Sequence, residues 1–300
     1  RSGHCAITHS SSSEVVIFGG FAVGNHNLND VLSFSIGTRQ WTRHECAGAS
    51  PSPRYRHAAC RLAESMYIFG GGTAEDDGSL NDLWEYALDT RTWMQVVSAG
   101  GSAPSPRSGH SLVPLGNRLV VFGGSDVRVF NLLNSALHCF DLQRRRWSSP
   151  TAVAEQPRAR WGHAAIPCGS GVFIFGGRGW CGEFLNDTFL LRYALGTRAW
   201  TQVVSAGGSA PSPREGHSLI PLGSRLVVFG GYNRVANLYD PALHCFDLQC
   251  RRWSDLVVGG EPCVRTGHSA IPCGGGVIIF GGSAVGGGRL NDTFLLRVWP

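Results

Sequence analysis

Short apolar runs, each closed by a pair of glycines, recur at regular intervals along the chain. The first is Val15-Val16-Ile17-Phe18-Gly19-Gly20. The later pairs are Gly70-Gly71, Gly123-Gly124, Gly176-Gly177, Gly230-Gly231 and Gly281-Gly282. Short runs rich in Val, Ile and Phe and bounded by turn residues are typical of strands. The interval of about 53 residues therefore predicts a repeated β-structure with six copies.

Polar landmarks keep the same phase as the apolar runs. Each run is preceded by an Arg with a His three residues later, and the pairs are Arg1/His4, Arg54/His57, Arg107/His110, Arg160/His163, Arg214/His217 and Arg265/His268. An Asp or Asn follows each run, at Asp30, Asp82, Asn134, Asp187, Asp240 and Asp292. A Trp comes next in five units, at Trp41, Trp93, Trp147, Trp200 and Trp253. Each unit thus predicts four strands: after the His, up to the glycine pair, after the Asp and around the Trp.

A lone four-stranded antiparallel sheet would expose two apolar faces, and radial closure of six such sheets leaves few edges unpaired. We therefore expect an all-β, six-bladed β-propeller of four-stranded antiparallel blades, forming a single domain over residues 1–300. The expected blades are roughly 1–53, 54–106, 107–159, 160–213, 214–264 and 265–300. The order Gly-Gly, Asp, Trp at this period resembles the kelch repeat, and the resemblance covers essentially the whole chain.

The last unit differs from the others. Leu290 to Arg297 aligns on Leu185 to Arg192, so Trp299 falls on Ala194 and is not the sixth blade Trp. We expect blade six to lack its outermost strand, or to be completed by a neighbouring molecule.

A second periodicity lies over the first. Residues 197–231 repeat residues 90–124 almost verbatim at an offset of 107, and the likeness continues from 162–192 to 267–297. Blades three and four thus resemble a duplicate of blades five and six, and these pairs are expected to superimpose closely. Specific function is better sought where the copies differ.

Composition narrows the function classes. All 26 basic residues are Arg, and 21 acidic residues leave a net charge of +5, which is too mild and dispersed to indicate a nucleic acid partner. No apolar run reaches the ~18 residues of a membrane span, and the first residues do not resemble a signal peptide. The ten Cys include no CxxC pair, so we expect free thiols and a cytoplasmic location. The propeller is expected to be monomeric, and its start inside a motif is consistent with a longer multidomain chain.

The six motif arginines allow two interpretations. In the structural one, each guanidinium pairs with the recurring Asp of its blade, and blade three, with Asn134, lacks that carboxylate. In the functional one, the guanidiniums surround one end of the central channel and bind carboxylates of a partner. The kelch resemblance supports the second, since arginines at this position in kelch substrate adaptors line the partner-binding face. The candidates are Arg1, Arg54, Arg107, Arg160, Arg214 and Arg265.

Other candidate contact residues follow the motif arginine or the glycine pair. Tyr55 and Trp161 offer aromatic anchors, although packing against the preceding proline loop is an equal alternative. The segments after the glycine pairs vary most among the blades and should emerge on the same face. They contribute Arg178, Trp180, Tyr232 and Arg234, and an acidic stretch over residues 75–77.

The sequence lacks the catalytic motifs of two kinds of enzyme that share the kelch fold. None of the six Tyr lies in a loop like those that bind copper in galactose oxidase, and the Glu-xxx-Asp-xxx-His pattern of kelch-type specifier proteins is absent. A metal ring of the six motif histidines is also unexpected, because six side chains related by rotation lie too far apart for one ion. We therefore predict a non-catalytic protein-interaction module that needs no cofactor or metal and binds an acidic or mixed-polarity segment at the channel mouth. The alternative is a small-molecule or metal-dependent activity there.

Overall fold

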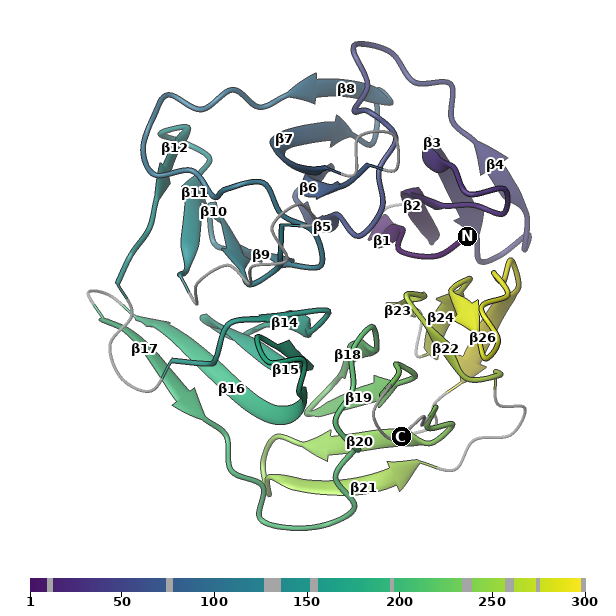
Figure 1. Ribbon diagram of the computed structural model, residues 1–300. Coiled ribbons are helices and arrows are strands. Elements are labelled where there is room, and N and C mark those ends of the chain that lie inside the picture. The colour runs from purple at the N-terminus through teal and green to yellow at the C-terminus, as the bar shows by residue number, and fades with distance from the viewer. Residues whose placement is uncertain are drawn as a thin grey trace.

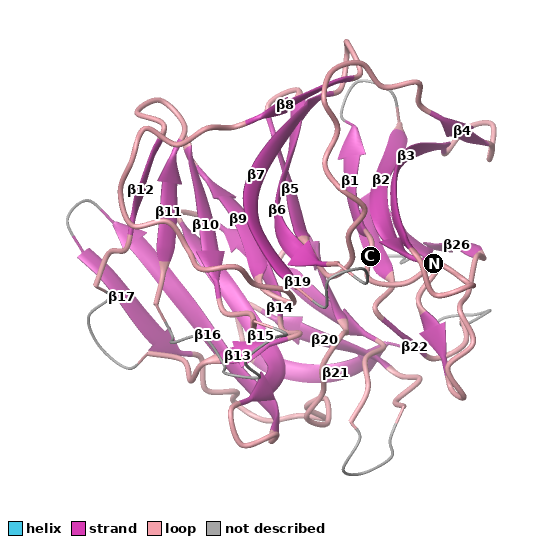
Figure 2. Ribbon diagram, turned by 45° about the horizontal axis from the view of Figure 1, so that its top comes forward, coloured by secondary structure: helices cyan, strands magenta, loops and turns pink. Residues whose placement is uncertain are grey.

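The computed structural model describes residues 1–9, 13–73, 78–126, 136–151, 156–194, 197–233, 239–256, 262–273 and 276–297. All regular elements in these ranges are strands, and they form six blades around a central axis (Figure 1). The predicted all-β, six-bladed propeller is confirmed. No helix in the described ranges could cross a bilayer. In Figure 2 the described connections between the sheets are loops and turns.

Each blade is an antiparallel sheet whose strands follow the chain from the axis outward. Blade one contains β1 (Cys5–His9), β2 (Glu14–Phe21), β3 (Asn27–Ser35) and β4 (Trp41–Arg43). Blade two contains β5 (Ala58–Leu62), β6 (Ser65–Gly72), β7 (Ser79–Ala87) and β8 (Thr92–Gln95). Blade three contains β9 (Ser111–Leu115), β10 (Arg118–Phe122), β11 (His138–Asp141) and β12 (Arg146–Ser148).

The second half of the ring repeats this order. Blade four contains β14 (Ala164–Cys168), β15 (Gly171–Gly179), β16 (Phe184–Ala194) and β17 (Thr197–Gln202). Blade five contains β18 (Ser218–Leu222), β19 (Arg225–Phe229), β20 (Leu243–Asp247) and β21 (Arg252–Leu256). Blade six contains β23 (Ser269–Cys273), β24 (Gly276–Phe280) and β26 (Thr293–Arg297). Three two-residue strands, β13 (Arg160–Trp161), β22 (Arg265–Thr266) and β25 (Ser283–Ala284), extend blades four and six.

The sixth sheet has three strands within the described residues, in the order β23-β24-β26. The expectation that its outermost strand is missing is confirmed. Leu295 on the outer edge strand is 43% exposed. It lines an apolar hollow of about 390 Å³ together with Phe34, Ile36 and Phe294.

The glycine pairs bend each second strand next to the channel. In blade one, Gly19 and Gly20 have φ of +63° and +98°, and the pairing register shifts between Phe18 and Gly20. A Cβ on Gly20 would lie 2.8 Å from the Cβ of His4. The bulge therefore requires glycine both for its backbone conformation and for the close approach of the motif His.

The hydrophobic core consists of layers between neighbouring blades, and the tryptophans pack in these layers. Trp93 of blade two lies 4.9 Å from Phe18 of blade one, measured between ring centroids. The equivalent pairs are Trp147 with Phe69, Trp200 with Phe122, Trp253 with Phe175 and Trp41 with Phe280, at 5.3, 5.1, 5.4 and 4.6 Å. Each Trp thus joins its own outer strand to the second strand of the preceding blade.

A closed belt of backbone hydrogen bonds joins all six blades around the channel. It is formed by the residue before each motif His. In every case the N–H donates to the carbonyl oxygen of the equivalent residue one blade earlier, over 2.7 to 2.9 Å. The donor and acceptor pairs are Arg56 to Gly3, Gly109 to Arg56, Gly162 to Gly109, Gly216 to Gly162, Gly267 to Gly216 and Gly3 to Gly267. The last bond closes the ring between blade one and blade six.

We expect the Trp253→Ala variant to lose about 3–5 kcal/mol in the free energy of unfolding, because Trp253 is buried between blades four and five. Trp41→Ala is the matched control, since half-buried Trp41 packs against the three-stranded blade and should cost clearly less. Urea unfolding measures both. Equal losses would show that the tryptophans do not act through interblade packing.

Candidate functional site

Six cross-strand pairs form the rim at one end of the channel, and we call them the mouth pairs. In each blade the residue after the motif Arg lies opposite the residue after the glycine pair, joined by antiparallel pairing. The pairs are Ser2 with Phe21, Tyr55 with Gly72, Ser108 with Ser125, Trp161 with Arg178, Glu215 with Tyr232, and Thr266 with Ser283. The structure therefore brings these two variable positions together, as expected.

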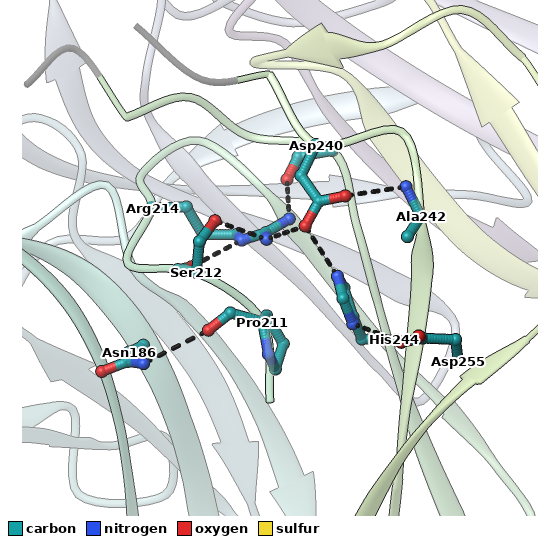
Figure 3. Close-up of polar contacts among 9 residues, drawn as sticks. Asn186, Pro211, Ser212, Arg214, Asp240, Ala242, His244 and Asp255 are labelled. Atoms are coloured by element: carbon teal, nitrogen blue, oxygen red, sulfur yellow. Dashed lines mark hydrogen bonds and ion pairs between the residues drawn. The ribbon is translucent and has the colours of Figure 1, made fainter. Parts of the chain in front are cut away.

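The motif arginines lie beneath this rim, and Arg214 shows how they are held (Figure 3). Its Nη1 donates to the carbonyl of Gly230, the first glycine of the pair, over 3.0 Å. Its Nε and Nη2 donate to the carbonyl and hydroxyl of Ser212 in the preceding loop. Nη2 also donates to Asp240 over 2.7 Å. Burial by itself would raise the pKa of Asp240, but hydrogen bonds from Arg214 and His244 outweigh it and lower that pKa.

Four further motif arginines make two-pronged ion pairs with the Asp of their blade. They are Arg1 with Asp30, Arg54 with Asp82, Arg160 with Asp187 and Arg265 with Asp292. Apart from Arg1, no motif arginine is more than 2% exposed. The structural interpretation is therefore the one the contacts support, and these guanidiniums are not open contact surfaces.

Arg107 of blade three is the exception among the buried arginines. Its guanidinium donates to carbonyl oxygens of Gly123 and Ser105 and to the Ser105 hydroxyl. Burial lowers the pKa of Arg107 to about 10. Asn134, which the sequence places opposite it, lies outside the described residues.

The six motif histidines are buried and bind to the preceding blade rather than facing a common ion. Nε2 of His163, for example, lies 3.0 Å from the hydroxyl of Ser111 in blade three. Burial lowers the pKa of His57, His163 and His268 to about 3, which leaves these rings neutral. In the described part of the chain no three His, Cys, Asp or Glu side chains meet as a metal site would require.

A cavity of about 470 Å³ opens at the mouth above the belt. Tyr55 and Trp161 line it, as do Phe21, Arg289 and Glu215. The aromatic candidates Tyr55 and Trp161 thus lie at the cavity.

Two arginine side chains on this rim make cation–π contacts with the ring of Trp161. The guanidinium carbon of Arg56 lies 5.2 Å from its ring centroid, and that of Arg178 lies 5.8 Å away. Arg178 also lies over Phe184, at 5.3 Å. Cation–π contacts of this kind hold the guanidiniums in place while leaving their N–H groups able to bind an anion.

Arg56 is a functional candidate that the sequence reasoning missed. It occupies the belt position that is Gly in the other five blades, and it keeps the left-handed conformation of those glycines, with φ of +51°. Glycine adopts this conformation without strain, whereas it is uncommon for a residue with a side chain. The sequence already shows this difference. Blade two reads Arg54-Tyr55-Arg56-His57, whereas the other five blades read Arg-x-Gly-His.

Glu215 follows the motif arginine of blade five, and its surroundings are unusual. It is half-buried, and its Oε2 atom is buried with no hydrogen-bond partner in the described residues. Burial raises the pKa of Glu215, and the charges of Arg56 and Arg178 offset this only in part.

The remaining predicted residues lie around this cluster. Trp180, at the tip of the blade-four loop, is 61% exposed. Tyr232 is the mouth partner of Glu215, and its ring lies 4.5 Å from that of Tyr239. Arg234 and the acidic stretch 75–77 lie outside the described residues.

The fold and this site define a β-propeller whose channel mouth carries the variable chemistry. A family model described as the "KLHDC2/KLHL20/DRC7 Kelch-repeats domain" matches residues 1–177 and 109–298. The chain therefore belongs to the kelch-repeat family, as its repeats indicated.

Two relatives illustrate the range of the family. The "Leucine-zipper-like transcriptional regulator 1 homolog" of Drosophila melanogaster is 27% identical over 98% of this chain and 30% of its own length. "Kelch domain-containing protein 3" of Rattus norvegicus is 30% identical over 77% of this chain and 61% of its own length. The chain thus spans less than two thirds of either relative. A solved structure titled "Structure of YjhT" shares the fold, with a TM-score of 0.78 and 18% identity over 99% of this chain and 95% of that one.

The buried ion pairs predict that Arg160→Met costs about 3 kcal/mol or more of unfolding free energy, because Asp187 and the Gly176 carbonyl lose their donor. Arg178→Ser, which installs the residue found at Ser283, should cost less than about 1 kcal/mol. Thermal or urea unfolding of both variants checks this. If the Arg160→Met variant is as stable as the wild type, Arg160 is not needed for folding, and the functional interpretation is favoured for this residue.

Replacing Glu215 by Gln should stabilise the unbound protein at pH 7 by about 1 kcal/mol, since it removes a half-buried charge that lacks a donor. The raised pKa of Glu215 means that the folded state binds its proton more tightly than the unfolded state. The penalty is therefore present at neutral pH and disappears as the pH falls below the usual Glu value of about 4.3. Urea unfolding of both proteins across this range should show the advantage of Glu215→Gln shrinking toward acid pH, and a constant difference would contradict the account.

Proposed function

We propose that this propeller is a non-catalytic protein-interaction module whose channel mouth binds an acidic or mixed-polarity segment of another protein. Kelch propellers are in general protein-interaction modules, and this chain belongs to that family. The face and the partner chemistry are inferred from the chain's own mouth.

The observation that carries the proposal is the stack of Arg56 and Arg178 on Trp161 beside an open cavity. Trp and Arg dominate binding energy at protein interfaces. Trp180 adds an exposed aromatic tip in the same blade. The buried motif arginines support this surface from below, because each fixes the residue that follows it on the rim.

The cavity volume also suits a small molecule, and this favours the alternative of a small-molecule activity at the same mouth. Mass spectrometry of the purified protein under native conditions separates the two. A retained low-mass ligand would support the alternative, and retention of a protein or peptide alone would support the proposal.

The ten cysteines are free thiols in the structure. We propose on this basis that the propeller is cytoplasmic, where thiols stay reduced. We propose separately that it is monomeric. Equilibrium sedimentation of the purified protein checks its oligomeric state.

The test of the proposed face uses substitutions that the other blades already carry. Trp161→Thr installs the residue of Thr266, and Arg56→Gly installs the belt residue of the other five blades. Both should therefore fold normally. We expect the double variant to weaken partner capture by about 30-fold or more, equivalent to about 2 kcal/mol at a hot spot.

Affinity capture followed by mass spectrometry and by titration of the captured protein measures this loss. Arg144→Ser, in the exposed turn between β11 and β12, is the matched control and should bind as the wild type does. If the mouth variant retains the same partner with the same affinity, the mouth is not the binding face.

A further inference from the structure

Opposite charges face the same cavity from different blades. Arg56 of blade two and Arg289 of blade six provide two cations, and Glu215 of blade five provides a carboxylate. The histidines that line the cavity add no charge, because burial holds their pKa far below neutrality. The Arg56 guanidinium reaches to the Trp161 ring of blade four, the blade next to Glu215, so charges of both signs meet in this cavity.

The Glu215 carboxylate feels the charges of Arg56 and Arg178, but the fold does not fully satisfy it. Its Oε2 atom has no donor in the described residues, and blade three carries Ser108 at the equivalent position with the same backbone pairing. A buried acceptor without a donor costs free energy that a binding partner can recover. Glu215 of blade five therefore costs folding free energy that Ser108 of blade three does not.

The cations are likewise additions to the repeat. Arg56 replaces the belt glycine, and Arg289 lies over the Phe21 ring at 4.4 Å. A purely acidic segment would satisfy these guanidiniums but would place like charge beside Glu215. A purely basic segment would do the reverse. Only a segment with both charges matches the whole cavity.

We infer that the mouth accepts a mixed-charge peptide segment, in which a basic side chain pairs with Glu215 and a neighbouring acidic side chain pairs with Arg56. This inference rests on the proposed function and specifies the partner's chemistry. Trp161, between the two sites of opposite charge, contacts the apolar part of the segment.

The test uses short synthetic peptides of three matched classes, with acidic, basic or alternating acidic and basic residues, immobilised and probed with the purified protein. The wild type should prefer the mixed class by about tenfold, which corresponds to about 1.4 kcal/mol. Glu215→Ser should lose the preference for the basic residue while still binding acidic peptides. Arg56→Gly should lose the preference for the acidic residue. Unfolding curves of both variants confirm that they are folded.

Two results would overturn the inference in different ways. If the wild type binds acidic and mixed peptides equally and Glu215→Ser changes neither, Glu215 does not select a basic residue, while the proposed function stands. If no peptide class binds and the Trp161→Thr/Arg56→Gly variant captures the same proteins as the wild type, both the inference and the proposed function fail.

Discussion

One buried guanidinium per blade determines how the rest of the ring is arranged. It links the loop entering the blade, the glycine turn and, in the five described cases, the Asp near the third strand. Burying such a charge is costly unless its donors are satisfied, and here a carbonyl, a loop and usually a carboxylate satisfy them. The residue after the arginine is thereby fixed on the channel rim, whatever its side chain.

In this arrangement the residues that hold the blades together differ from the rim residues that would determine which partner binds. Blades three and five share long stretches of sequence, yet their rims carry Ser108 and Glu215. Blades four and six likewise carry Trp161 and Thr266 at one position. Because the belt and the ion pairs lie below the rim, these exchanges alter the chemistry of the mouth without disturbing the blade. The differences gather on blades two, four and five, which gives a symmetrical fold an asymmetrical binding face.

The sequence predicted the fold well because its signals are local and repeated. The glycine pairs, the Trp spacing and the alignment of Leu290 to Arg297 specified six blades, the interblade packing and the three-stranded sixth blade. Burial of the motif arginines was left open, since the spacing that places a guanidinium at the mouth does not reveal whether it points into protein or solvent. Arg56 could have been recognised as a broken glycine pattern. The unmatched carboxylate of Glu215 could not, because it depends on which donors from other blades reach the cavity.

In this account a partner binds at the mouth of the channel and not at the outer turns of the blades. Amide hydrogen exchange of the chain, alone and with a captured partner segment bound, tests it most directly. The account predicts slower exchange at residues 55–56, at 161, after the glycine pair 176–177 and at 215, with no change in the outer turns at 143–146 and 249–251. Protection confined to those outer turns, with unchanged exchange at the mouth, would contradict it.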